Sequence, residues 1–97
     1  MILPKLLEFQ WDEGNIFKNL RKHGLTKEEI EKSFFDKNRI IFKDEQHSLK
    51  EDRAILVGKN DGNKILYVVF TMRSNKIRVV SARDINRKEK YIYEKTA

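Results

Sequence analysis

The stretch from Lys64 to Arg83 constrains the fold more than any other part of the chain. Its first half, 65–72, is apolar at nearly every position and rich in β-branched and aromatic residues, as is typical of a strand buried on both faces. Ser74 and Asn75 then predict a two-residue hairpin turn into a second strand over 76–83. We therefore expect an antiparallel sheet in which 65–72 is the central strand.

The register of this hairpin predicts which side chains share a face of the sheet. If Arg73 lies opposite Lys76, then Thr71 lies opposite Arg78. The first face then carries Tyr67, Val69, Thr71, Arg73, Arg78 and Val80. The second, nearly all apolar and expected to cover the core, carries Leu66, Val68, Phe70, Met72, Ile77, Val79, Ser81 and Arg83. A slip of one residue would exchange the two faces.

Capping signals predict two helices ahead of the sheet, after a short edge strand at 8–11. Asp12 is a good N-cap for a helix over 13–23, which Gly24 ends. Its expected apolar stripe is Ile16, Phe17 and Leu20. Thr26 and Glu29 form a capping box for a second helix that runs to about 34–35. Leu25 and Ile30 have the spacing of a hydrophobic staple, and Ile30 and Phe34 are expected to be buried.

The rest of the chain predicts two more strands and a last helix. The strands cover 39–43 and 53–58, and Asp61-Gly62 signals a hairpin into the central strand. Asp84 or Asn86 caps the last helix, whose apolar stripe is Ile85 and Ile92. The order β-α-α-β-β-β-β-α predicts an α+β fold with the helices on one face of the sheet. At 97 residues the chain makes one domain, 1–97.

Composition narrows the chemistry. The chain has no cysteine and two histidines, so neither a disulfide framework nor a zinc site is expected. No glycine-rich phosphate loop appears, and we expect no cofactor. The opening segment MILPKLLEFQW resembles neither a signal peptide nor a membrane span, so we expect a cytoplasmic protein without a membrane partner.

Positive charge is concentrated in the last quarter of the chain. From Arg73 to Lys95 there are eight Lys or Arg residues and three acidic residues, a balance of +5 out of a net charge of +6. A localised basic region attracts polyanions through phosphate contacts and counterion release. The alternative is an ordinary solvated helix face.

Several motifs in order resemble the BrnT family, the toxins of type II toxin–antitoxin pairs with a RelE-like ribonuclease fold. They are FQWDEG at 9–14, NLRKHG at 19–24, HSLKEDR at 47–53, IRVVSAR at 77–83 and RKEKYIY at 87–93. The family usually has lysine at the position of Asn15, phenylalanine at that of Lys27 and alanine near Ile30. The resemblance implies a ribonuclease that inhibits translation. It also implies a cognate antitoxin, usually a ribbon-helix-helix protein encoded nearby, with which the toxin forms an oligomer.

Cleavage of RNA without a metal ion uses the neighbouring 2′-hydroxyl as nucleophile. It needs a group that accepts the hydroxyl proton, cations that hold the phosphate, and a donor for the leaving oxygen. Our candidates for these catalytic roles are Arg83, Arg73, His47, Arg53, Glu89 and Tyr93. For binding RNA we add Arg78, Arg87, Lys88 and Lys76.

Each candidate has a structural alternative. Arg83 matches the SAR motif and suits a two-point grip on phosphate, but an ion pair with Glu89 or Asp84 competes. Arg53 has the same kind of competitor in Asp44, Glu45 or Glu51. His47 suits acid–base work near neutral pH or is a loop histidine without a role, whereas His23 is better explained as a cap on its helix. Arg73 is otherwise a solvated turn arginine, and Tyr93 a core or base-stacking residue. Two alternatives stay open for the whole chain: a non-catalytic nucleic-acid-binding module and an antitoxin-binding module.

Overall fold

The computed structural model of the chain describes residues 3–47 and 51–96, and apart from the short first strand its helices and strands follow one another in the predicted order. The helices of the described part are α1 (Glu13–His23), α2 (Lys27–Ser33) and α3 (Arg87–Thr96), and a short 3-10 helix, η1, spans Glu45–His47. The strands form a four-stranded antiparallel sheet in the order β1-β2-β3-β4. Their bounds are β1 (Ile40–Lys43), β2 (Arg53–Lys59), β3 (Ile65–Arg73) and β4 (Lys76–Asp84).

The central position of β3 is confirmed. It pairs with β2 on one side and with β4 on the other. Ser74 and Asn75 make the tight turn between β3 and β4 with φ angles of 51° and 64°, the positive values that a type I′ hairpin requires. The strand expected at 8–11 is reduced to an isolated parallel bridge between Phe9 and Ile77 on the outer edge of β4.

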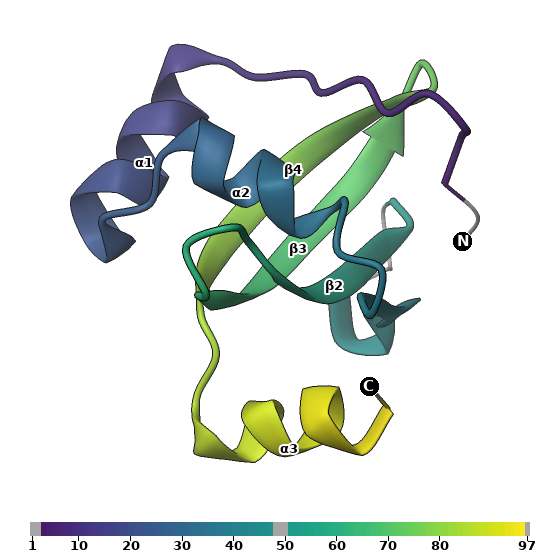
Figure 1. Ribbon diagram of the computed structural model, residues 1–97. Coiled ribbons are helices and arrows are strands. Elements are labelled where there is room, and N and C mark those ends of the chain that lie inside the picture. The colour runs from purple at the N-terminus through teal and green to yellow at the C-terminus, as the bar shows by residue number, and fades with distance from the viewer. Residues whose placement is uncertain (1–2, 48–50, 97) are drawn as a thin grey trace.

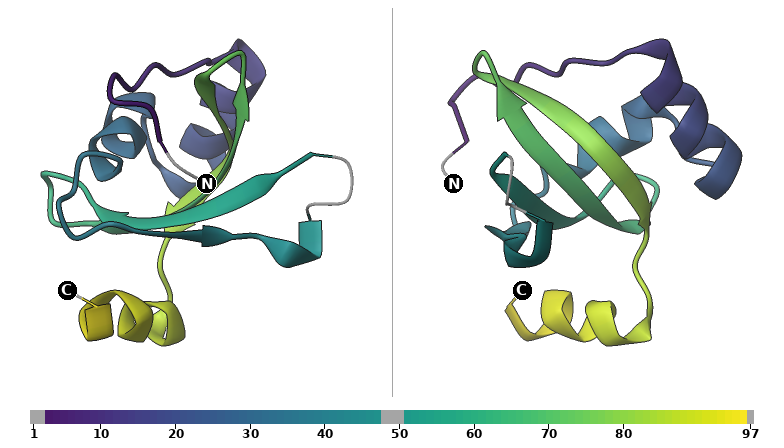
Figure 2. Two further views of the ribbon diagram at one scale, coloured as in Figure 1. Left: turned by 90° about the vertical axis from the view of Figure 1, so that its right-hand side faces the viewer. Right: turned by 180° about the vertical axis from the view of Figure 1, so that it is seen from behind.

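The helices lie on both faces of the sheet, so the expectation that all three share one face is wrong. In Figure 1 and in the left view of Figure 2, α1 and α2 lie on one side of the sheet and α3 on the other. The reason is visible in β2, where consecutive residues from Ala54 to Val57 are buried. Because neighbouring residues of a strand point to opposite faces, both faces of β2 are apolar and each needs a cover.

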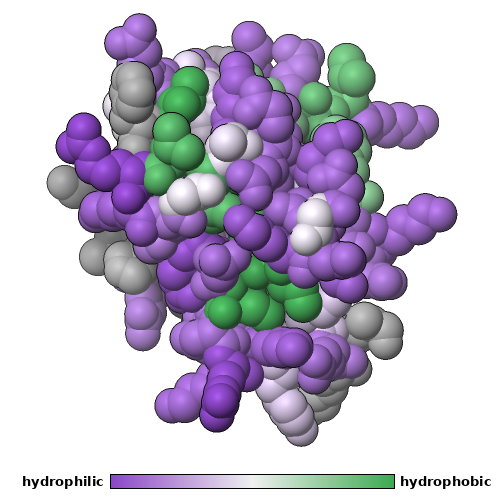
Figure 3. Space-filling model, turned by 60° about the vertical axis from the view of Figure 1, so that its left-hand side comes forward, coloured by the Kyte–Doolittle hydropathy of each residue, from purple (hydrophilic) through white to green (hydrophobic). Residues whose placement is uncertain are grey.

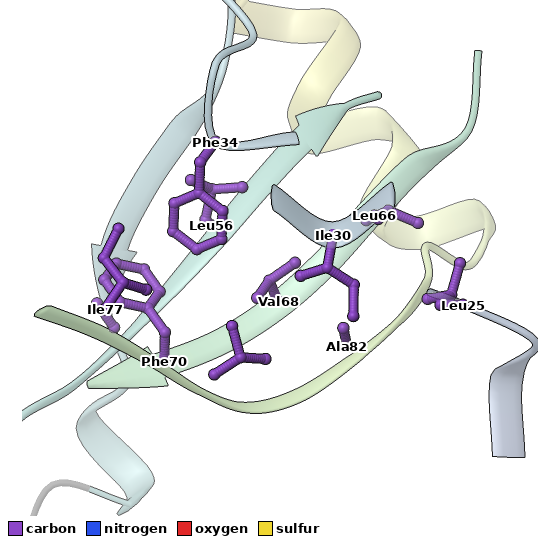
Figure 4. Close-up of a cluster of buried hydrophobic side chains, with 11 residues drawn as sticks. Leu25, Ile30, Phe34, Leu56, Leu66, Val68, Phe70, Ile77 and Ala82 are labelled. Atoms are coloured by element: carbon purple, nitrogen blue, oxygen red, sulfur yellow. The ribbon is translucent and has the colours of Figure 1, made fainter. Parts of the chain in front are cut away.

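The main core lies between α2 and the sheet. Ile30 and Phe34 are fully buried, as predicted, and pack with Leu56, Val68 and Phe70 (Figure 4). The ring of Phe34 meets that of Phe70 edge to face at 5.2 Å between centroids. The backbones of α2 and β2 also approach closely, since a Cβ atom added to Gly58 would lie 2.4 Å from the carbonyl oxygen of Ser33. Only glycine fits at this crossing.

The predicted caps are confirmed, while two predicted apolar stripes need correction. Asp12, Thr26 and Gly24 hold the helix ends as expected, with Gly24 at a φ of 65°. On α1, however, Leu20 is 45% exposed, and the buried residue of that turn is the polar Asn19. On α3, Ile92 is exposed and Tyr93 is buried instead. In both helices the inward residue has a polar group with a hydrogen-bond partner: Asn19 bonds Ala82, and the Tyr93 hydroxyl bonds Asp36.

Candidate functional site

A bulge in β4 decides which way Arg83 faces. Phe70 pairs with Val79, but the preceding residue of β3, Val69, pairs with Ser81, so Val80 is an extra residue on β4. Ala82 consequently lies in the core, and Arg83 pairs with Tyr67 on the opposite face. The predicted placement of Ser81 and Arg83 on the core face is therefore wrong, because strict alternation does not allow for an extra residue.

This second face of the sheet is divided into two parts. Its apolar part lies beneath α3, where Tyr93 packs with Ile55 and Val57. Beside it an open groove of about 380 Å³ is formed by β2, β3, β4 and the segment that follows β1. The groove is lined by Asp44, Gln46, Arg53, Tyr67, Val69, Val80, Ser81 and Arg83.

Arg83 is held in the groove by two contacts. Its Nη1 and Nη2 atoms each donate a hydrogen bond of 2.6 Å to the Glu89 carboxylate, one to each oxygen. Its guanidinium carbon also lies 4.2 Å from the ring centroid of Tyr67, a cation–π arrangement. The hydrogen bonds with Glu89 raise the pKa of Arg83, and they lower the pKa of Glu89 despite its burial. The planar guanidinium group of Arg83 is thus held in the groove with its two Nη atoms bound to the two oxygens of one carboxylate.

Glu89 is fixed by the start of α3. Its Oε1 accepts a hydrogen bond of 3.0 Å from the backbone N–H of Asn86, whose Oδ1 accepts one of 2.9 Å from the N–H of Glu89. The predicted capping box is confirmed, with Asn86 rather than Asp84 as the cap. The carboxylate that holds Arg83 therefore also holds the first turn of α3.

The other predicted arginines of the sheet form ion pairs with acidic residues. Arg53 lines it, and its Nε lies 3.7 Å from Glu51. Arg73 contacts the other oxygen of the same Glu51 carboxylate at 3.3 Å, so one acidic residue lies between two cations. Arg78 instead extends to Asp12 at 2.7 Å. The Asn15 N–H and Arg78 together lower the pKa of that carboxyl group.

Tyr93 is placed to anchor α3. Its hydroxyl donates a hydrogen bond of 2.5 Å to Asp36, and its side chain is only 6% exposed. Burial, together with the neighbouring Asp36 carboxylate, raises the pKa of Tyr93 to about 12, so it keeps its proton at neutral pH. The same contact, with the N–H groups of Lys59 and Asn38, outweighs burial and lowers the pKa of Asp36.

The remaining sequence candidates are more peripheral. His47 ends η1, next to the groove-lining Gln46, but its side chain lies outside the described part of the structure, as do residues 48–50 of the expected polar loop. Lys76 is exposed at the turn between β3 and β4, and Arg87 and Lys88 are exposed on α3. Hydrophilic residues cover most of the face in Figure 3, with hydrophobic residues in separate small patches.

Sequence reasoning assigned no role to Tyr67, Gln46 or Ser81, and it named Asp44 only as a possible ion-pair partner of Arg53. Tyr67 had a partial signal, since its alternation with Val69 and Thr71 placed it on the face with Arg73 and Arg78, although Arg83 was expected on the other face. Asp44 directly follows a strand, where polar side chains often border a site. Ser81 had no usable signal, because its place in the groove depends on the bulge.

Among the described residues, no three His, Asp or Glu side chains gather as a metal-binding cluster would require. None of the helices in residues 3–47 and 51–96 is long and apolar enough to cross a membrane.

Comparison with known proteins gives one family. Residues 11–89 match the family described as the ribonuclease toxin, BrnT, of type II toxin–antitoxin systems. The fold is similar to the crystal structure of the Brucella abortus ribonuclease toxin BrnT, with a TM-score of 0.62 and 25% sequence identity. The alignment covers 84% of this chain and 100% of the Brucella chain. No curated protein matches the sequence.

Proposed function

Because the chain belongs to the BrnT family of ribonuclease toxins, we propose that it is a metal-independent endoribonuclease whose active site is the groove around Arg83. The observation that carries this proposal is the guanidinium fork of Arg83, which stacks on Tyr67 and grips both oxygens of Glu89. A phosphodiester offers two oxygens in a similar geometry, so the fork suits an RNA backbone.

In the proposed reaction, a base removes the proton of the 2′-hydroxyl and the 2′-oxygen attacks the adjacent phosphorus. The bond from phosphorus to the 5′-oxygen breaks, and that oxygen takes a proton. The products are a 2′,3′-cyclic phosphate and a 5′-hydroxyl. Arg83 and Arg53 hold the phosphate as negative charge grows on its oxygens, and this electrostatic contribution is usually the largest single one.

Glu89 can link the binding of RNA at Arg83 to the removal of the 2′-hydroxyl proton. RNA has to displace the Glu89 carboxylate from Arg83 before a phosphate can take its place. The displaced carboxylate is ionised at neutral pH and lies next to the bound phosphate, where it can accept the 2′-hydroxyl proton. His47 is the other candidate for proton transfer. Tyr93 is assigned the anchoring of α3, since its proton is held by Asp36.

The cations outside the groove are assigned to the RNA chain on either side of the cleaved bond. Arg73, Lys76 and Arg78 lie toward the turn between β3 and β4, whereas Arg87 and Lys88 lie at the start of α3. Arg83 lies between these two groups along the chain. Contacts of this kind raise affinity for any RNA sequence and weaken with salt.

A cognate antitoxin is the natural partner of a type II toxin, and we propose that it covers this groove with an acidic segment. Excess Asp and Glu on the antitoxin would match the positive charge of residues 73–95 and speed the encounter. By the family resemblance, this antitoxin is a ribbon-helix-helix protein that assembles with the toxin into a larger oligomer, and cleavage of RNA by the free toxin inhibits translation in the cytoplasm.

The test incubates the purified protein with a long RNA in the presence of excess chelator, and in parallel with DNA of the same sequence. We expect the RNA to be cut to fragments with 2′,3′-cyclic phosphate ends, which mass spectrometry identifies. The DNA should bind and stay whole, because it lacks the 2′-hydroxyl. Binding of RNA without any cut, over long incubation, supports the non-catalytic binding module instead, and absence of binding supports an antitoxin-binding module.

A further inference from the structure

Two asparagines of α1 bind the backbone of β4 from the side opposite β3. The Nδ2 of Asn15 donates a hydrogen bond of 2.6 Å to the carbonyl oxygen of Val79. The Oδ1 of Asn19, one helical turn later, accepts a hydrogen bond of 3.1 Å from the N–H of Ala82. Asn19 is 1% exposed, and its Nδ2 donates to the Asn15 carbonyl oxygen, so both ends of its amide are used.

These contacts lie on either side of the bulge at Val80. In a regular strand, outward-facing N–H and C=O groups recur every second residue. The backbone N–H and C=O of Ile77 face outward and bond Glu8 and Gln10 of the N-terminal segment, and the carbonyl of Val79 also faces outward. Without the extra residue, Ala82 would turn its N–H toward β3. The hydrogen bond to Asn19 is therefore available only in the shifted register.

The same shift turns Arg83 into the groove. With the bulge, Ala82 is buried in the core while Arg83 lies beside Tyr67 and grips Glu89. We infer that Asn19, supported by Asn15, is a positioning residue of the ribonuclease site, which fixes the bulge and thereby the place of Arg83. The inference rests on the proposed function for its effect on cleavage, but the geometry that it predicts is testable without RNA.

A purely structural role is the competing explanation, because β4 is an edge strand and its outward groups need partners wherever α1 covers them. In that case the loss of Asn19 would lower the stability of the protein and nothing else. Folded molecules would keep Arg83 in place and cleave RNA at the usual rate.

The experiment compares Asn19→Ala and Asn15→Ala with Ile30→Val, a core change in α2 that destabilises the fold and removes none of the hydrogen bonds from Asn15 and Asn19 to β4. All are assayed at a temperature where unfolding curves show each to be folded. Cleavage under single-turnover conditions should slow by about 10-fold to 10²-fold in Asn19→Ala, the scale of a misplaced catalytic group. The slowing should be smaller in Asn15→Ala and absent in Ile30→Val. In Asn19→Ala the decrease should appear in the cleavage rate constant at saturating enzyme, and RNA affinity should change less.

A second measurement does not depend on cleavage. The rate at which phenylglyoxal modifies Arg83, followed by mass spectrometry, should rise several-fold in Asn19→Ala as the fork leaves Glu89. In the parent protein, the Ala82 amide should exchange slowly with solvent despite its place on an outer edge. If Asn19→Ala does not fold, the cleavage rate of Asn15→Ala and its labelling at Arg83 test the positioning role instead.

The outcomes separate the two proposals. Suppose that the parent cleaves RNA, and that Asn19→Ala matches Ile30→Val both in cleavage rate and in labelling of Arg83. The positioning role is then wrong, while the proposed function stands. If the parent does not cleave but the labelling and exchange results hold, the function fails and the geometric inference survives. Fast exchange of the Ala82 amide overturns the inference in either case.

Discussion

The ion pair between Arg83 and Glu89 makes a quantitative prediction for Glu89→Gln. Glutamine is nearly the same shape and still accepts the hydrogen bond from the Asn86 N–H, because Gln serves as well as Glu in a capping box. The substitution therefore removes the negative charge opposite Arg83 and leaves the start of α3 capped. Loss of stability then reports on the ion pair rather than on the helix.

The exposure of the pair sets the expected size of the effect. A hydrogen bond to a charged group contributes about 1.5 to 3 kcal/mol where solvent is excluded, and a fully exposed pair contributes about 0.2 to 1 kcal/mol. The Glu89 side chain is 14% exposed and that of Arg83 is 37% exposed, so water screens one partner substantially. We expect a coupling of about 1 kcal/mol between the two residues.

The assay is a double-mutant cycle from urea unfolding curves of the parent, Glu89→Gln, Arg83→Ala and the double variant. The cycle cancels the packing that Arg83→Ala loses on Tyr67. Because the pKa of Glu89 is lowered in the folded state, its stabilisation is present above the ordinary carboxyl range and is lost as pH falls through the lowered value. The difference between the parent and Glu89→Gln should shrink accordingly in acid.

A coupling near zero at neutral pH would show that the pair does not form in solution, and the argument for a preset fork at Arg83 would fail with it. The RNA affinity of Glu89→Gln is an independent check. Since the competing carboxylate is gone, the variant should bind RNA several-fold more tightly than the parent. If it binds more weakly, Glu89 does not occupy the phosphate position.

Three further predictions concern the core, α3 and the partner. Phe70→Ala should cost about 3 to 5 kcal/mol in urea unfolding, because it leaves a cavity beneath Phe34, and fast amide exchange along β3 in the parent would contradict its central place. Tyr93→Phe should cost about 1 to 2 kcal/mol at neutral pH, since Asp36 loses a donor. Because the pKa of Tyr93 is raised to about 12, this stabilisation is complete below the ordinary tyrosine value and fades as pH rises toward 12, so unfolding curves of parent and variant should converge in alkali. The association rate with the antitoxin should fall clearly with added salt, and a rate indifferent to salt would speak against an acidic covering segment.

Features fixed by local interactions could be predicted from the sequence. Asp12, Thr26 and Asn86 cap their helices through bonds to residues three positions away, and Ser74-Asn75 turns the hairpin through its own backbone angles. The hairpin register placed Leu66, Val68 and Phe70 on the core face, where they lie. Such signals lie within a few residues of the feature that they determine.

Features that depend on distant contacts could not be predicted. Val79, Val80 and Ser81 suit a regular strand as well as a bulge, and the shift is held by Asn15 and Asn19, which are more than sixty residues away in sequence. The place of α3 on the far face likewise follows from distant contacts: Tyr93 packs on Ile55 and Val57 of β2 and bonds Asp36, 57 positions away. The orientation of the candidate site followed from these contacts and not from any motif.

The most direct test of the central claim is the cleavage rate of Arg83→Ala, measured in chelator beside Arg83→Lys and the exposed control Arg87→Ala. If Arg83 stabilises the charge that grows on the phosphate, Arg83→Ala should lower cleavage by about 10² to 10³-fold while the protein remains folded. Arg83→Lys should also be slow, since one ammonium cannot reproduce a planar two-point grip, and Arg87→Ala should lose only affinity. A folded Arg83→Ala that cleaves RNA at the parent rate would show that the active site lies elsewhere.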